Sequence, residues 1–186
     1  MRFEEFFDAA IRGDVDRMFL SGGQIDRYGN ANVTAIGGMP SPKVKLGGGG
    51  GGCNLSATIR RLTEWSTNHR GGRCLVEACD FITDIGHRTP SGNRVDLGYT
   101  GGGPEWLVTE LGMFDFVDER ARLRRIFPDV SLDEFTAATG FGFEIADDFG
   151  PVDEPSKEEI ELVRRIDPLG VRKSEFKKTE LSRSFG

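Results

Sequence analysis

Histidine and cysteine are scarce in this sequence, with two histidines and three cysteines among 186 residues. His69, His87, Cys53, Cys74 and Cys79 show none of the spacings typical of metal ligands, so we predict no metal site. An odd number of cysteines without a disulfide pattern favours a reducing compartment. We therefore expect a cytoplasmic protein.

Long apolar runs and an excess of positive charge are also missing. No stretch approaches the roughly 20 apolar residues that a membrane-spanning helix needs, and the acidic N-terminus lacks a secretory signal. The formal net charge is −6, whereas nucleic-acid-binding domains usually carry a basic face. We expect neither a membrane nor a nucleic acid among the partners. Basic residues over 171–186 are interrupted by glutamates and are interpreted as a solvated C-terminal tail.

Alternating strand-like and helix-like segments predict a single α/β domain over residues 1–170. The hydrophobic content of 37% is sufficient for a substantial core. We expect an open, mostly parallel, Rossmann-like sheet with helices on both sides and a β-hairpin extension. Helical spacing marks residues 3–11, and capping boxes begin helices after Ser131 and Ser156. Strands are expected over 17–20, 31–36, 43–46 and 73–76, with hairpin strands over 106–109, 114–117 and 123–127.

Six consecutive glycines, residues 47–52, separate a strand-like run from a helix-like run over 54–62. Glycine permits positive φ and close approach to the backbone, and the first N–H groups of a helix have no internal partner. The run therefore predicts an anion or oxyanion cradle. Cys53-Asn54 stands where a Walker A loop requires Lys followed by Ser or Thr, so a phosphate loop is disfavoured, as is a dinucleotide site. A flexible linker is the alternative interpretation.

Other reactive residue types have weaker support. A nucleophilic Cys53 would need a base, which the sequence does not place beside it, so a small buried residue is the simpler interpretation. His69 is expected on the surface or in a loop, and His87 at the start of an exposed loop over 86–104. Glu64 lacks supporting context.

The segment Gln24-Ile25-Asp26-Arg27-Tyr28-Gly29-Asn30 resembles a motif of the β subunits of family I coenzyme A transferases, of the glutaconate CoA-transferase type. The strand-like run before the glycines is similar to that family's next motif, a strand leading into a Gly-x-Gly-Gly loop, on which residues 48–51 fall. Further similar blocks lie at 76–83 and 107–116. The resemblance covers roughly residues 15–170.

This resemblance implies the fold of that family and an enzyme that moves CoA between an acyl-CoA and a carboxylate. In such enzymes a glutamate attacks the acyl-CoA, and the Gly-x-Gly-Gly amides are thought to stabilise the oxyanion. A CoA thioester is then a substrate, and no cofactor is bound permanently. A role in turn geometry explains Asn30 and Asn32 as well as a role in a substrate pocket does. The site residues that the resemblance implies are backbone contacts at Gly48, Gly50 and Gly51, and pocket-facing side chains at Gln24, Asn30 and Asn32.

The family's catalytic glutamate precedes the similarity that begins here near Phe19, and no matching motif occurs in the first eighteen residues. The catalytic residue is therefore unassigned. The chain could be truncated, a partner could supply the residue, or the chemistry could do without it. The last case resembles the β subunits of acyl-CoA hydrolases that open steroid rings in cholesterol breakdown, which is the alternative function. An inactive scaffold is a third possibility. For either enzyme we expect a hetero-oligomer with an α subunit.

Overall fold

The computed structural model describes residues 2–175, without the side chain of Glu175. Its contacts divide the chain into two compact units, Met1–Pro151 and Val152–Gly186, which are described separately. The domain boundary expected at residue 170 stays a prediction. Of the C-terminal tail, the part after residue 175 lies outside the described residues.

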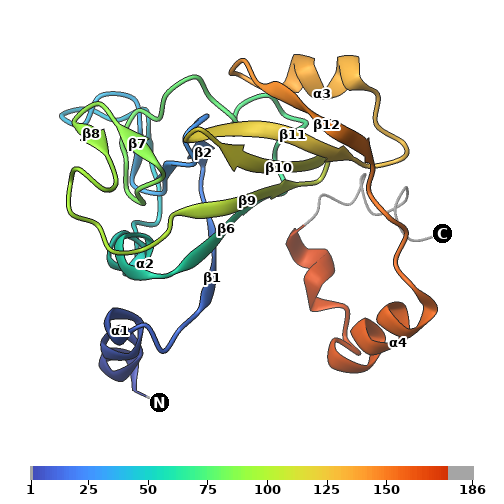
Figure 1. Ribbon diagram of the computed structural model, residues 1–186, viewed down its shortest axis with the longest axis horizontal. Coiled ribbons are helices and arrows are strands. Elements are labelled where there is room, and N and C mark those ends of the chain that lie inside the picture. The colour runs from blue at the N-terminus through green and yellow to red at the C-terminus, as the bar shows by residue number, and fades with distance from the viewer. Residues whose placement is uncertain (1, 176–186) are drawn as a thin grey trace. The chain divides into compact units, whose positions relative to one another are not determined.

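A six-stranded sheet lies at the centre of the first unit (Figure 1). Its strands, in spatial order, are β1 (Arg17–Ser21), β6 (Arg61–Ser66), β9 (Pro104–Thr109), β10 (Gly112–Val117), β11 (Arg120–Ile126) and β12 (Glu144–Pro151). The first three strands run parallel, β10 is antiparallel to both of its neighbours, and β12 is parallel to β11. This arrangement confirms the open, mostly parallel sheet with hairpin strands.

Helices pack on one face of this sheet. Leu62 of β6 packs against Leu55, and Phe114 of β10 packs against Phe135. The strand register places Leu62 and Phe114 on the same face. Phe19 points to the opposite face and is 62% exposed. The helices of this unit are α1 (Phe3–Arg12), α2 (Gly52–Thr58) and α3 (Leu132–Ala138).

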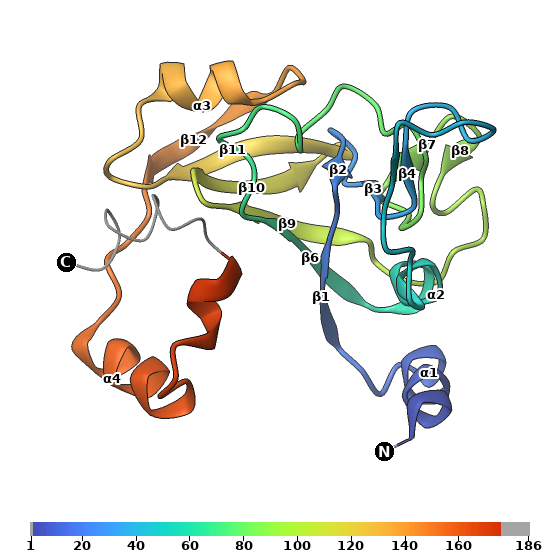
Figure 2. The same ribbon diagram turned by 180° about the vertical axis from the view of Figure 1, so that it is seen from behind.

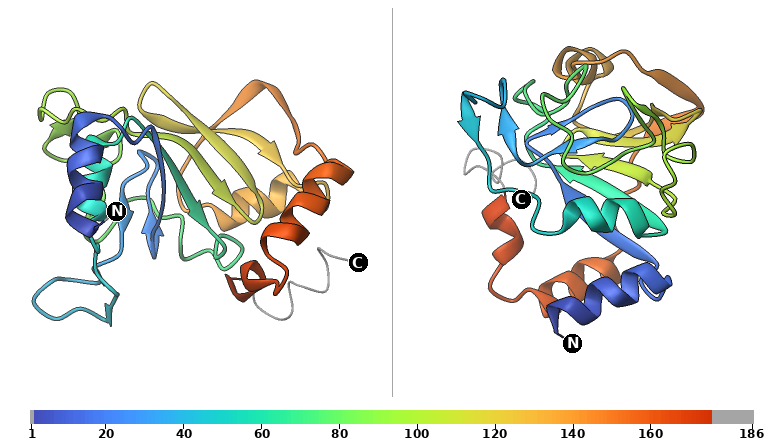
Figure 3. Two further views of the ribbon diagram at one scale, coloured as in Figure 1. Left: turned by 90° about the horizontal axis from the view of Figure 1, so that it is seen from below. Right: turned by 90° about the vertical axis from the view of Figure 1, so that its left-hand side faces the viewer.

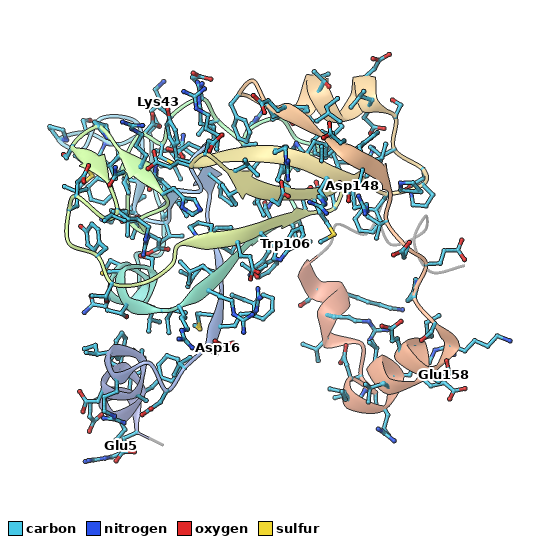
Figure 4. All side chains as sticks on the ribbon, in the orientation of Figure 1. Glu5, Asp16, Lys43, Trp106, Asp148 and Glu158 are labelled. Carbon is cyan, nitrogen blue, oxygen red and sulfur yellow. The ribbon has the colours of Figure 1, made fainter. Side chains whose placement is uncertain are left out.

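The expectation of helices on both sides of the sheet is therefore wrong for the described part of the first unit. Side chains on the uncovered face are instead partly exposed and polar in places, as at Asp115, which pairs with Arg122 and Arg124. Trp106 of β9 lies on that face as well, in register with Asp115 (Figure 4). Ion pairs of this kind keep a sheet face compatible with water without a covering helix.

Short strands replace several of the longer predicted ones. The run 31–36 is interrupted and forms two strands, the strand expected over 43–46 keeps two residues, and 73–76 is no strand, although Leu75 bridges to Ile25. The loop over 86–104 contains a small hairpin (Figure 2). The short strands are β2 (Gln24–Ile25), β3 (Ala31–Asn32), β4 (Ala35–Ile36), β5 (Val44–Lys45), β7 (Arg88–Thr89) and β8 (Gly92–Asn93).

The helix predicted over 54–62 is shorter and is followed by a strand. Ile59 ends α2 with an extended ψ of 138°, and β6 begins at Arg61. Leu55, Ile59 and Leu62 have helical spacing and do share one buried cluster, but Leu62 reaches it from the sheet. Apolar spacing alone therefore predicted the cluster correctly and the backbone conformation wrongly.

Both predicted N-caps are present. The Ser131 hydroxyl accepts the amide of Glu134 at 3.1 Å, while the Glu134 carboxylate pairs with Arg70 rather than completing a capping box. Ser156 forms a complete box with Glu159 at the start of α4 (Lys157–Ile166). In the second unit α4 is followed by the 3-10 helix η1 (Val171–Glu175).

Candidate functional site

The glycine run connects β5 to α2 and contains three residues in left-handed conformations. The φ angle is +91° at Gly48, +52° at Gly50 and +103° at Gly51. Side chains other than that of glycine are strained at such angles, most of all where φ exceeds +90°. The sequence therefore adopts a path here that needs glycine at these positions.

The amides of the run differ in what they bind. The Gly48 N–H donates to the carbonyl of Val33 at 2.7 Å, and the Gly52 N–H donates to the carbonyl of Gly49 at 2.6 Å. Within residues 2–175, the N–H groups of Gly50 and Gly51 have no hydrogen-bond acceptor. The same is true of the N–H groups of Gly47 and Gly49, so Gly49, Gly50 and Gly51 present three consecutive amides that a ligand could use without breaking an existing bond.

Close packing explains some of the other glycines. A Cβ at Gly51 would lie 2.3 Å from Cζ of Phe7 on α1, and one at Gly52 would lie 2.6 Å from Oδ1 of Asp84. A Cβ at Gly49 would meet the Thr83 methyl group at 2.9 Å. Figure 3 shows α1 beside α2, the helix that the glycine run leads into. The run is therefore packed against two other segments of the unit, unlike a free linker.

A cavity of about 350 Å³ lies next to the run. Thr83 connects the two, because its methyl group contacts Gly49 while its hydroxyl binds the Val33 amide at 3.0 Å. Cys53, directly after the run, also lines the cavity, and its thiol donates to Oδ1 of Asn54 at 3.2 Å. Cys53 is exposed, contrary to the expectation of a buried residue. The lining residues are Cys53, Ile82, Thr83, Ile85, Thr89, Ser91, Leu97 and Tyr99.

Gln24 and Asn32 form a buried amide pair. The Asn32 side-chain amide donates to Oε1 of Gln24 and to the carbonyl of Ala35, both at 2.7 Å. Gln24 in turn donates to Oδ2 of Asp80 at 3.1 Å, and Asp80 also accepts the amide of Gly37 at 2.8 Å. These bonds hold β2, β3 and β4 together. Neither amide lines the cavity, and a substrate role for them stays a prediction.

Asn30 is the centre of a second buried network. Its side-chain amide donates to the Asp26 carboxylate at 2.9 Å and to the carbonyl of Arg88 at 2.7 Å, while Oδ1 accepts the Gly86 amide at 2.8 Å. Burial raises the pKa of Asp26, although its hydrogen bonds with Asn30 and Tyr28 oppose the shift. Asn30 therefore joins the 26–30 turn to residues 86–88, which lie between the cavity-lining residues Ile85 and Thr89.

Arg94 was not singled out from the sequence, yet its side chain organises the cavity wall. It is 4% exposed and donates to the carbonyls of Ser56, Ile85, Gly86 and Gly101 at 2.5 to 2.9 Å. Burial lowers the pKa of Arg94 to about 10, so the guanidinium stays charged at neutral pH. The carbonyl oxygens compensate the charge by accepting these hydrogen bonds, and the bonds join α2 to the loop over 86–104.

Two buried carboxyl groups lie close to the start of α2, and sequence reasoning missed both. Glu64 of β6 is 0% exposed and Asp84 is 2% exposed. Both oxygens of Glu64 and Oδ1 of Asp84 have no hydrogen-bond partner within the described residues. Burial, and after it the charge of Asp84, raises the pKa of Glu64 to about 8, while burial raises that of Asp84 to about 6. The sequence signal that could have revealed the burial of Glu64 is its position two residues after Leu62, since alternate residues of a strand face the same side.

Neither histidine is on an exposed loop. His69 is fully buried between the hydroxyls of Thr109 and Thr139, each 2.9 Å from a ring nitrogen. Burial, and next the charge of Arg70, lowers the pKa of His69 to about 4. His87 is half-buried with Nε2 at 2.7 Å from the carbonyl of Pro104. The surface placement expected for His69 is wrong, because two hydroxyl partners satisfy it in the interior.

Membrane spans and metal clusters are both absent from residues 2–175. No helix in this range is long and apolar enough to cross a membrane. No cluster of three or more His, Cys, Asp or Glu residues in the same range has a geometry that would hold a metal ion.

Comparison with known proteins finds that the chain is similar to B subunits of CoA-transferases. The B subunit of glutaconate CoA-transferase from Acidaminococcus fermentans is 32% identical over 154 residues, which are 81% of this chain and 56% of that protein. The B subunit of 3-oxoadipate CoA-transferase from Pseudomonas knackmussii is 29% identical over 83% of this chain and 60% of its own length. The chain is a homologue of coenzyme A transferase B subunits. No protein-family model matches it.

Hydrolase subunits are equally similar. The cholesterol ring-cleaving hydrolase IpdB subunit of Rhodococcus jostii is 28% identical over 94% of this chain and 68% of that protein. The chain thus spans between about half and two thirds of the length of these curated relatives.

Solved structures agree with this placement. The Rhodococcus jostii IpdAB structure matches with a TM-score of 0.80 and 26% identity over 95% of this chain and 71% of its own. The decarboxylase AibA/AibB matches with a TM-score of 0.77 and 26% identity, over 95% of this chain and 67% of its own. Glutaconate CoA-transferase from Acidaminococcus fermentans matches with a TM-score of 0.72 and 27% identity, over 88% and 63% of the two chains. The expected fold is confirmed.

Proposed function

We propose that this chain is the B subunit of a CoA-transferase that moves CoA between an acyl-CoA and a carboxylate, acting together with an A subunit. The observation that carries the proposal is the row of unbonded amides at Gly49, Gly50 and Gly51, in a loop that leads directly to the cavity-lining Cys53, in a homologue of CoA-transferase B subunits. A CoA thioester is the substrate in this proposal, with no permanently bound cofactor.

These amides suit the chemistry of a thioester. When a nucleophile attacks the thioester carbonyl, the oxygen becomes an oxyanion that needs hydrogen-bond donors already in place. Each such donor contributes roughly 3 to 4 kcal/mol of transition-state stabilisation. Gly49, Gly50 and Gly51 supply adjacent donors, whereas Gly48 can do so only after releasing Val33. The nucleophile is not assigned to any residue of this chain.

A ring-cleaving hydrolase B subunit is the second candidate. The observation in its favour is that the IpdB relative is matched over 94% of this chain. Both candidates use the same amides to bind a thioester oxygen. They differ in the bond that breaks: the transferase moves CoA from an acyl group to a carboxylate, whereas the ring-cleaving hydrolase adds water across a ring bond of the substrate.

The test uses the complex of this chain with its A subunit. The complex is mixed with an acyl-CoA and isotopically labelled acetate. Formation of labelled acetyl-CoA is expected for the transferase. Loss of the thioester, or opening of a ring, without acetate supports the hydrolase. If the complex forms and neither reaction occurs with a panel of acyl-CoAs, both proposals fail and an inactive scaffold is the remaining function.

A further inference from the structure

Glu64 is placed on the helix-covered face of the sheet. It follows Leu62 by two residues on β6, so both side chains point to the face where Leu62 packs against α2. The carboxyl group is fully buried and has no hydrogen-bond partner within the described residues. A buried acid without partners is costly when charged, and native proteins retain few such groups. Glu64 therefore needs an explanation other than packing.

Asp84 lies between Glu64 and the glycine run. Its backbone is fixed to Ala31 by two hydrogen bonds, from the Ala31 amide at 2.9 Å and to the Ala31 carbonyl at 3.0 Å. A Cβ on Gly52 would lie 2.6 Å from Oδ1 and 2.9 Å from Oδ2 of Asp84. The carboxylate therefore rests directly on the backbone of Gly52, one residue after the unbonded amide of Gly51. Asp84 and this end of the run are therefore packed directly against each other.

The surroundings of the two acids contain other acidic groups. Burial raises the pKa of the Cys74 and Cys79 thiols, and the charge of Glu64 contributes to both shifts. Asp26 acts on Cys79 in the same direction. Neither Glu64 nor Asp84 forms an ion pair within the described residues, because the nearby Arg94 guanidinium is bound to carbonyl oxygens, among them that of Ile85. A second negative charge at Glu64 would therefore repel Asp84 without compensation.

We propose that Glu64 and Asp84 form a buried positioning pair for the glycine run, in which Asp84 supports Gly52 directly and Glu64 keeps Asp84 in place by remaining uncharged. The pair deepens the proposed function, on which its catalytic consequence rests. Ionisation of Glu64 adds a like charge next to Asp84, displaces it from Gly52 and turns the Gly50 and Gly51 amides away from the ligand. Neither acid touches the substrate, so both are positioning residues.

The proposal is tested first without any enzymatic activity. Amide resonances of Gly50, Gly51 and Gly52 in the full chain are followed by NMR from pH 5 to 9.5. In the wild type we expect two inflections, near pH 6 and near pH 8, as Asp84 and then Glu64 lose their protons. Glu64→Gln should abolish the upper inflection. Asp84→Asn should abolish the lower inflection and weaken the upper one, because the charge that Glu64 repels is then missing. Glu110→Gln is the matched control, since Oε2 of Glu110 is also buried without a partner, and it should change neither.

The second test measures turnover by the complex with its A subunit. Because the uncharged form of Glu64 is active, the wild-type kcat should fall about tenfold between pH 7 and 9, one unit above the pKa of about 8. Glu64→Gln should reduce this fall to less than about twofold, while the binding-dominated KM at pH 7 stays unchanged. Glu64→Asp keeps an ionisable group and should restore the alkaline fall.

The outcomes separate the two proposals. If the glycine resonances titrate as described but no CoA chemistry is found, the positioning pair stands and the proposed function fails. If the glycine resonances do not titrate in the wild type, or titrate identically in Glu64→Gln, the positioning pair is refuted. Should Glu64→Gln not fold, Asp84→Asn and Glu64→Asp take its place: a weakened upper inflection in Asp84→Asn, with two inflections in Glu64→Asp, supports the pair, whereas an unchanged upper inflection in Asp84→Asn refutes it.

Discussion

The burial of Glu64 makes a quantitative prediction about how the stability of the first unit depends on pH. The carboxyl group has a pKa of about 8 in the folded chain, against an ordinary value of 4.5 when unfolded. Between these values the folded chain binds a proton that the unfolded chain has released. The free energy of unfolding therefore falls as pH rises. The contribution is complete below pH 4.5 and is lost as pH rises through 8.

The magnitude follows from the same two values. Each pH unit within this window costs about 1.4 kcal/mol, so the contribution of Glu64 falls by roughly 3 to 4 kcal/mol between pH 5 and 8. Glu64→Gln removes the titration and introduces a buried amide whose cost does not depend on pH. The difference in stability between variant and wild type should thus move in favour of the variant by that amount. The titration of Asp84, common to both chains, largely cancels.

Urea denaturation at four pH values provides the assay. The two tryptophans of the chain, Trp65 on β6 and Trp106 on β9, report on the sheet of the first unit, so their fluorescence follows the relevant transition. Equal urea dependences for the two chains would show that the comparison is sound. A stability difference that stays constant within about 0.5 kcal/mol from pH 5 to 8 would refute the reasoning. A difference moving in favour of the wild type would mean that Glu64 is paired with a cation.

Three further predictions concern other residues. Gly50→Val should lower turnover by the complex about 100-fold, because φ at +52° is unfavourable for a β-branched residue and one oxyanion donor is lost. The control is Gly47→Val, at a position with ordinary φ where an added Cβ meets no atom within 4 Å. It should stay within about threefold of the wild type in the same assay. Asn30→Ala should lower the free energy of unfolding by about 2 to 4 kcal/mol in urea denaturation, because it leaves buried polar partners unpaired. Asn68→Ala, at an exposed position, should lower it by less than about 0.5 kcal/mol. Equal losses for the two variants would contradict the network. His69 should remain neutral from pH 8 to 5 in NMR spectra of its ring, because its pKa is about 4, and a midpoint near 6.5 would show that it is exposed.

Local signals in the sequence predicted much of the fold. Apolar spacing predicted α1, serine caps predicted α3 and α4, and the strand pattern of the second half predicted β9 to β11. These features depend on neighbouring residues, so a single sequence contains them. The turn from α2 into β6 was missed because Leu62 reaches the same buried cluster from a strand as it would from a helix.

The candidate site was predictable only in its backbone part. Glycine permits the positive φ found at Gly48, Gly50 and Gly51, whereas the interpretation of the run as an anion cradle stays a prediction. The burial of Glu64 and His69 depends on segments 20 to 70 residues away, such as Asp84 and Thr139, which no local pattern places beside them. The buried titratable groups of this site could therefore not be predicted from the sequence, because their burial depends on tertiary contacts.

The four carbonyl contacts of Arg94 have a consequence for how this protein can be redesigned. The guanidinium fixes the cavity wall at Ser56, at residues 85–86 and at Gly101, so the stretch between Arg94 and Gly101 is a loop with both ends anchored. Val95 in that stretch is 82% exposed, whereas Leu97 and Tyr99 line the cavity. Leu97 can therefore be exchanged without touching these four bonds, whereas the Tyr99 ring centroid lies 5.9 Å from Cζ of Arg94 and is part of the attachment. The shape of the cavity can change by substitution at Leu97 while the frame that holds it stays the same.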